Sequence, residues 1–201
     1  MNFNLWIEVL KKPVQTFKKV KKSADLTEGL LNVVVAGVII GFLNGLMAMA
    51  FGTSIAGAFM PVAAGAVGIA TFFGVLIGTP IGNAISWIVA SAVLYVIAKF
   101  LGGKGNFKTQ AYLYAIYIAP IGVITAVLNL IPVAGPILSL IVSLYGLYLL
   151  TMSLKEAHGF TVGKAVLTWL IPALIVVVIA AIIGAAIATM VLGGLITLPS
   201  M

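Results

Sequence analysis

The sequence predicts an all-α polytopic membrane protein, a helical bundle with five transmembrane helices. Hydrophobic residues make up 63% of the 201 residues and charged residues only 7%, whereas a soluble domain carries roughly a quarter of its residues charged. Apolar runs of about 20 residues, long enough to cross a hydrocarbon core of about 30 Å, follow one another along the chain. These runs are too many and too long for a signal peptide followed by a soluble domain.

Residues 1–28 form a basic segment, which we separate from a transmembrane domain at 29–201. On a helical wheel the apolar side chains of this segment gather on one face and its lysines mostly on the other. The pattern is typical of an amphipathic helix in the membrane interface, bound to anionic lipid; the alternative is packing on the protein's own cytosolic loops. Pro13 predicts a split into two short helices. The expected lipid-surface contacts are Trp6, Lys11, Lys12, Phe17, Lys18, Lys19 and Lys22.

The first transmembrane span is expected at about 29–51. Asp25 and Glu28 have the spacing of a capping box, which places the start of a helix just before this span. Small residues recur every four positions along the span and leave one face of bare backbone. Because such a face allows a second helix to approach closely, we predict a packing seam inside the molecule rather than a dimer interface. Its residues are Gly37, Gly41 and Gly45.

Residues 52–79 are apolar and rich in glycine, and the second span is expected at about 80–101. Prolines at Met60-Pro61 and Thr79-Pro80 are interpreted as breaks that leave a run at the short limit for crossing a bilayer. We therefore predict an interfacial or re-entrant element on the outer side. A second set of small residues at intervals of four predicts another packing seam. It consists of Gly74, Gly78 and Gly82.

The lysines predict the topology of the bundle. They lie before the first span, at 99–108 and at 155–164, and none lies in 52–79, at 132–136 or in the C-terminal tail. If 52–79 does not cross the membrane, every lysine lies on one side, as cytoplasmic loops require. We therefore expect a cytoplasmic N-terminus and an outer C-terminus. The net charge of +7 is explained by orientation in the membrane, not by nucleic-acid binding.

The remaining three spans are expected at about 109–131, 134–154 and 165–191. Pro120 lies in the middle of the third span. A proline inside a membrane helix is tolerated where neighbouring groups satisfy the carbonyl that it frees. We interpret Pro120 as a static kink, with a functional hinge as the alternative.

Few side chains in the sequence could carry chemistry. His158 is the only histidine and no Cys is present, so we expect no metal site and no cofactor. Glu156 and His158 are expected in a solvated inner loop, where they would orient the protein or face lipid headgroups. Since no ionisable residue lies deep in a predicted span, ion-coupled transport and enzymatic catalysis in the membrane are not expected. The polar residues within or at the end of spans are Asn44, Asn83 and Asn129, interpreted first as helix–helix hydrogen-bonding groups.

Several short motifs follow one another in a characteristic order between Leu101 and Pro172, and Trp6, Pro13 and Phe17 in the N-terminal segment belong to the same pattern. They are Leu101-Gly102-Gly103 with Phe107, Tyr117-Ile118-Ala119-Pro120, Ile131-Pro132 with Gly135, Tyr145-Gly146-Leu147-Tyr148, Leu154-Lys155-Glu156-Ala157-His158-Gly159, and Lys164-Ala165 with Pro172. In this order and spacing the chain resembles the YIP-domain family, the Ypt-interacting membrane proteins, and within it the compact prokaryotic members. The resemblance implies five spans, a cytoplasmic N-terminus and a short outer C-terminus.

The same resemblance bears on possible partners. Eukaryotic members of that family bind prenylated Rab GTPases and carry a longer polar region, with an acidic stretch, before the first span. This chain has only a short basic segment there. GTPase binding is therefore not expected, and the expected partners are membrane lipids, another membrane protein or a second copy of the chain.

Two functions remain as alternatives from the sequence. The first is a non-enzymatic scaffold in a prokaryotic cell membrane, which organises partners or the local bilayer through its basic cytoplasmic face. The second is a small transporter or channel for an uncharged or lipidic solute. A water-accessible cavity lined by Asn44, Asn83 or Asn129 would favour the second. A lipid-modifying enzyme lacks acid–base candidates in the membrane.

Overall fold

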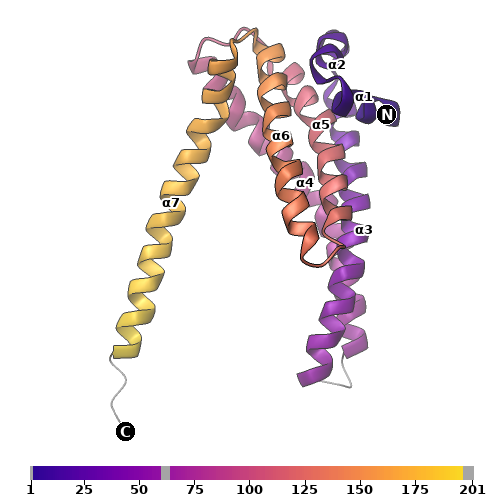
Figure 1. Ribbon diagram of the computed structural model, residues 1–201, viewed down its shortest axis with the longest axis vertical. Coiled ribbons are helices and arrows are strands. Elements are labelled where there is room, and N and C mark those ends of the chain that lie inside the picture. Colours follow the sequence, from indigo (N-terminus) through magenta and orange to yellow (C-terminus); the bar gives the residue numbers. More distant parts are fainter. Residues whose placement is uncertain (1, 60–63, 197–201) are drawn as a thin grey trace.

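The protein is a bundle of long helices with a pair of short helices at one end (Figure 1). The computed structural model describes the backbone of residues 2–59 and 64–196, and the side chains of residues 2–50 and 65–190. Five of the helices are long and apolar enough to cross a membrane. This confirms the predicted all-α polytopic bundle. The elements are α1 (Phe3–Lys11), α2 (Pro13–Val20), the 3₁₀ turn η1 (Lys21–Ser23), α3 (Leu26–Phe59), α4 (Ala64–Phe100), α5 (Phe107–Leu128), α6 (Ala134–His158) and α7 (Val162–Ile196).

The short N-terminal helices pack on the protein itself. Pro13 is the first residue of α2, so the predicted split into two helices is confirmed. The predicted lipid contact of the apolar face is wrong at two residues, since Trp6 is 7% exposed and Phe17 is fully buried. Phe17 packs with Val9 against the buried face of α5, including Tyr117. A helical wheel shows that one face of a helix is apolar, but it does not show whether that face contacts lipid or protein. Here the apolar face packs on neighbouring helices.

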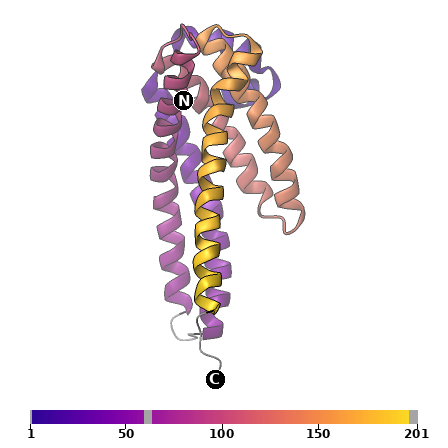
Figure 2. The same cartoon turned by 90° about the vertical axis from the view of Figure 1, so that its left-hand side faces the viewer.

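Helices α3 and α4 form an antiparallel hairpin that is longer than predicted. They contain 34 and 37 residues, so each is about 50 Å long or more. The predicted interfacial or re-entrant element at 52–79 is therefore wrong over its described part, because α3 continues to Phe59 and α4 begins at Ala64. Residues 60–63, which include the break predicted at Met60-Pro61, lie outside the described residues. Figure 2 shows both helices, and α7, reaching well beyond the α5–α6 turn.

Pro80 lies inside α4 without breaking it, because α3 accommodates the backbone there. A proline has no N–H, so the carbonyl of Leu76 loses its usual helical donor. Gly41 lies directly against that carbonyl; a Cβ at Gly41 would be 3.1 Å from the Leu76 oxygen. The missing side chain thus leaves space for this oxygen against the backbone of α3.

The two sets of regularly spaced glycines lie in different environments. A Cβ at Gly37 would lie 2.5 Å from the Pro80 Cα, and one at Gly45 would lie 3.0 Å from the Phe72 ring. In contrast, a Cβ at each glycine of the second set would meet nothing within 4 Å, so these residues do not form the predicted seam inside the chain. They are Gly74, Gly78 and Gly82. The four-residue spacing of small residues therefore does not predict which face of α4 packs on α3.

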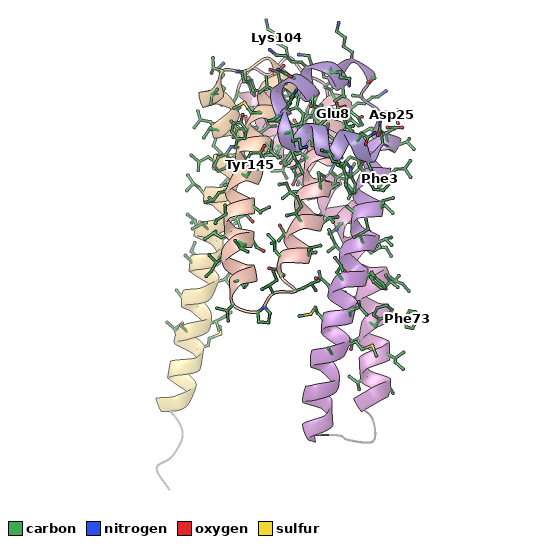
Figure 3. All side chains as sticks on the ribbon, turned by 45° about the vertical axis from the view of Figure 1, so that its right-hand side comes forward. Phe3, Glu8, Asp25, Phe73, Lys104 and Tyr145 are labelled. Carbon is green, nitrogen blue, oxygen red and sulfur yellow. The ribbon has the colours of Figure 1, made fainter. Side chains whose placement is uncertain are left out.

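The charged residues gather at one end of the bundle, called here the lysine end. It comprises the N-terminal segment and the ends of the long helices that carry Lys99, Lys108, Lys155 and Lys164. Figure 3 shows Glu8, Asp25 and Lys104 at this end and Phe73 far from it along α4. Asp25 caps α3 by accepting hydrogen bonds from the backbone N–H groups of Thr27 (2.9 Å) and Glu28 (3.1 Å). The predicted helix start is therefore confirmed.

Candidate functional site

A cavity of about 450 Å³ lies between α3, α4 and α5. Most of its wall is apolar, and polar side chains come from all three helices. These polar residues are Asn44, Asn83, Ser86, Tyr114, Thr125 and Asn129. The three asparagines that the sequence singled out therefore share one cavity, although they are separated by up to 85 residues along the chain.

The three asparagines lie at a similar depth. At 1.5 Å per helical residue, Asn44 lies about 27 Å from the start of α3, Asn83 about 26 Å from the end of α4, and Asn129 about 33 Å from the start of α5. All of these helix ends belong to the lysine end. The asparagines therefore form one polar level across the three helices.

The side-chain amides differ in how they are satisfied. The Oδ1 atom of Asn129 accepts a hydrogen bond from the Ser139 hydroxyl at 2.8 Å, which leaves its amide N–H groups as donors. Neither Asn44 nor Asn83 has a hydrogen bond to another described residue. Asn44 is exposed and Asn83 is half-buried, so both amides are accessible to a partner outside the chain. The cavity thus presents donors and acceptors that suit a polar group of a bound molecule.

The residues that line the cavity toward the lysine end are buried. Val33, Ala36 and Trp87 line that part and are all buried. The indole N–H of Trp87 donates a 3.0 Å hydrogen bond to the carbonyl of Ala111, which fixes the ring between α4 and α5. Asn44 and Asn129, at the opposite part of the lining, are exposed. The lining of the cavity is therefore more exposed on the side remote from the lysines.

No Asp, Glu, Lys, Arg or His is among the described residues that line the cavity. An ionic ligand would have no counter-charge there, and burying an unpaired charge in such surroundings is strongly unfavourable. The chemistry of the site is therefore hydrogen bonding by carboxamide and hydroxyl groups within an apolar wall.

His158 is buried at the lysine end, so its predicted solvated role is wrong. Its Nε2 atom is 2.7 Å from the Oε1 atom of Gln110, whose own amide N–H donates to the carbonyl of Ser91 at 2.8 Å. This second bond fixes the Gln110 amide, so His158 donates from Nε2. A Cβ at Gly103 would lie 2.6 Å from Nδ1. The histidine joins α4, α5 and α6, and the close turn at Gly103 covers it.

Glu156 is also enclosed, with its side chain 8% exposed. The Lys21 ammonium lies 3.3 Å from its carboxylate, so the pair connects η1 to the end of α6. The sequence placed Glu156 in a solvated loop because it could not show that the N-terminal segment folds back over this position. Neither Glu156 nor His158 lies in the cavity.

Pro120 lies in α5, which continues to Leu128, and its side chain is buried. It does not line the cavity. The alternatives of kink and hinge therefore remain predictions for this residue.

Three polar residues that connect helices or line the cavity were not singled out in the sequence. Asn32 is buried in α3, where its Oδ1 atom accepts a 2.6 Å hydrogen bond from the Trp6 indole. Gln110 holds His158, and Tyr114 contributes to the cavity. Their signal is the presence of an amide or phenol in an otherwise apolar run, the same signal that identified Asn44.

The five apolar helices, three of which enclose a cavity with polar side chains in a mainly apolar wall, define a polytopic α-helical integral membrane protein. The family model of the Yip1 domain matches residues 7–185. The chain belongs to the Yip1-domain family, as the sequence resemblance predicted. The match begins within α1 and extends into α7, so it includes the N-terminal helices that pack on α5. Neither a curated protein nor a solved structure gives a significant match to the chain.

Proposed function

We propose that the protein is a non-enzymatic transporter that binds an uncharged molecule with hydrogen-bonding groups, either a small solute or the polar head of a lipid. The observation that supports this is the convergence of Asn44, Asn83 and Asn129 on one cavity. This feature favours a transporter over a scaffold, because binding a small molecule needs such a cavity and scaffolding does not.

The size and chemistry of the cavity support small-molecule binding. A volume of about 450 Å³ lies within the range of roughly 300–1,000 Å³ that ligand sites occupy. Ligand sites also combine an apolar wall with a few polar groups that fix orientation. Because the buried Trp87 lies at the end of the cavity nearer the lysines, we favour a binding step that alternates between sides over a continuous channel.

Access to the cavity can be tested with single cysteines, since the chain contains no Cys. Asn83→Cys should react with a charged, membrane-impermeant thiol reagent in proteoliposomes. Ile85→Cys is the matched control, because Ile85 lies on the apolar groove that α3 and α4 form on another face. Equal, negligible reaction at both positions would contradict a water-accessible cavity.

Ligand binding can be tested on protein purified from native membranes. Native mass spectrometry should detect a co-purifying uncharged molecule, and Asn44→Leu with Asn83→Leu should abolish its retention. The control is Val38→Leu with Ile81→Leu, which changes two exposed apolar positions on the same helices. Retention that survives the asparagine changes would place the ligand elsewhere.

A second candidate function is the scaffold that the sequence favoured, acting through a basic cytoplasmic face. It is supported by four lysines on the N-terminal segment that have no carboxylate partner among the described residues. They are Lys11, Lys12, Lys18 and Lys22. This proposal includes the expected topology, with the lysine end in the cytoplasm of a prokaryotic cell. Its test is whether neutralising all four lysines removes membrane-protein partners that co-purify with the chain.

A further inference from the structure

The polar faces of α1 and α2 meet in a groove at the lysine end. Their apolar faces turn toward α5, so the groove lies on the outside of the molecule. Its volume is about 410 Å³, and its lining includes Glu8, Lys11, Lys12, Gln15 and Lys19.

The groove carries an excess of positive charge. The carboxylate of Glu8 forms an ion pair with Lys19, with 3.2 Å between Oε2 and Nζ. Lys11 and Lys12 have no carboxylate partner among the described residues. Lys11 and Lys12 both line the groove together with the exposed Gln15, and their side chains are donors that suit the oxygens of a phosphate group.

The groove also has an apolar edge. Phe3, Ile7 and Lys11 follow one another at intervals of four and share one face of α1. Phe3 is 56% exposed and Ile7 is 52% exposed, and Ile7 lines the groove. An apolar strip that leads directly to two lysines matches a molecule with a hydrocarbon part and a phosphate, and free phosphate would make no use of it.

Contacts with α3 and α6 fix the position of α1 and of this edge. Trp6 is bonded to Asn32 in the second turn of α3, and the Tyr145 hydroxyl donates a 2.6 Å hydrogen bond to the carbonyl of Leu10. These contacts hold α1 against the second turn of α3 and the middle of α6, on the part of the bundle nearer the lysine end.

From these observations we propose that the groove between α1 and α2 binds the phosphate of an anionic glycerophospholipid, with Lys11 and Lys12 on the phosphate and Ile7 beside the acyl region. The groove is separate from the asparagine cavity, so this proposal does not depend on the proposed transport function.

The test uses the full chain in nanodiscs of phosphatidylcholine with increasing phosphatidylglycerol, and native mass spectrometry of the lipid retained after extraction. Lys11→Gln with Lys12→Gln should reduce retained phosphatidylglycerol about tenfold, given the attraction expected of two lysines after screening. The matched control is Lys18→Gln with Lys22→Gln, which removes the same charge from exposed lysines outside the groove lining. The control should reduce retention less than about twofold.

A second variant acts in the opposite direction. Glu8→Gln removes the negative charge beside Lys19 and should increase retention about twofold to threefold, because a third ammonium becomes available. An equal loss of retained phosphatidylglycerol in both double-lysine variants, or no loss in either, would contradict a lipid site in this groove. An unchanged or lower retention in Glu8→Gln would also contradict it. Displacement of the lipid by inorganic phosphate at about 10 mM would show that the groove takes free phosphate and overturn the lipid assignment.

Discussion

Helices α5 and α7 are both membrane-spanning helices, yet they occupy opposite environments. Eleven residues of α5 are buried, and the helix contacts α3, α4, α6 and the N-terminal segment. In α7 every described side chain from Ala173 to Met190 is exposed. Figure 1 shows α7 diverging from the α3–α4 hairpin below the lysine end. The more apolar of the two helices is therefore the peripheral one.

This difference shows why apolarity does not predict burial in a membrane protein. Lipid tails solvate Ile and Val as well as another helix does, so helix association needs close packing and internal hydrogen bonds. The central helix carries Gln110, Tyr112 and Tyr117 on its buried face, whereas α7 beyond Pro172 consists mainly of aliphatic residues. Polar and small residues mark the centre of the bundle.

The largest effect is expected where a glycine touches backbone. Gly37→Leu should destabilise the protein by about 3 kcal/mol, because the new Cβ would lie 2.5 Å from the Pro80 Cα, which cannot move without displacing α4. Gly184→Leu on α7 is the control, since a Cβ there meets nothing within 4 Å. Thermal unfolding in detergent measures both. Equal melting temperatures for the two variants would show that the α3–α4 contact is loose.

Shortening a buried side chain should have the next largest effect. Leu113→Ala leaves a cavity in the cluster that joins α1, α2 and α5, and should cost about 2 kcal/mol. Leu174→Ala on α7 removes the same atoms from an exposed position and should change stability very little. Comparison of their detergent unfolding curves measures the difference. If the two changes cost the same, α7 is packed against a partner in solution.

A smaller effect is expected from two tryptophans that anchor different regions. Trp6→Phe removes the donor to Asn32 and leaves a buried amide oxygen unpaired, at a cost of about 1–2 kcal/mol. Trp169→Phe removes a 3.0 Å bond to the Thr151 hydroxyl, which connects α7 to α6 in a partly exposed position and should cost less. Hydrogen exchange of α1 and of α7 reports each anchor separately. Protection of α1 that persists in Trp6→Phe would mean that apolar contacts alone hold it.

Much of the fold could be predicted because its signals are local. The lengths of the apolar runs predicted the long helices, Asp25 predicted the start of α3, and Pro13 predicted the division of the N-terminal segment into two helices. The long hairpin was missed because the cost of Pro80 depends on a neighbour, the bare backbone of Gly41. A proline considered without its neighbours predicts a break in the helix, whereas here the helix continues through Pro80 because it packs on α3.

The candidate site was predicted in its residues and not in its geometry. An asparagine in an apolar span is visible in the sequence, so Asn44, Asn83 and Asn129 could be named. Their meeting in one cavity depends on how three helices are rotated, which the sequence does not encode locally. Likewise, the amphipathic pattern around Trp6 fits both a lipid surface and a protein surface, and only tertiary contacts distinguish them.

The smallest effect concerns the residues that begin α3 and α7. Asp25 accepts two backbone hydrogen bonds at the start of α3, whereas Thr161 accepts one long bond, 3.5 Å, from the backbone N–H of Lys164 at the start of α7. The bond from Glu28 is the largest cause that lowers the pKa of Asp25 below its ordinary value of 3.8, and the bond from Thr27 adds to it. The packed region thus has a titratable cap, and α7 has a cap that does not titrate.

The sign of the pH dependence follows from that lowered pKa. The stabilisation by ionised Asp25 is present above the unfolded-state pKa and is lost as the pH falls through the lower folded-state pKa. Asp25→Ala should therefore lower the melting temperature more at about pH 7 than at about pH 3. Thr161→Ala should lower it slightly and by the same amount at both pH values, since a hydroxyl keeps its proton throughout. Scanning calorimetry in detergent at the two pH values measures the four differences. A pH-independent loss in Asp25→Ala would mean that the carboxylate charge adds nothing to the cap, and that the two helix starts differ only in hydrogen-bond geometry.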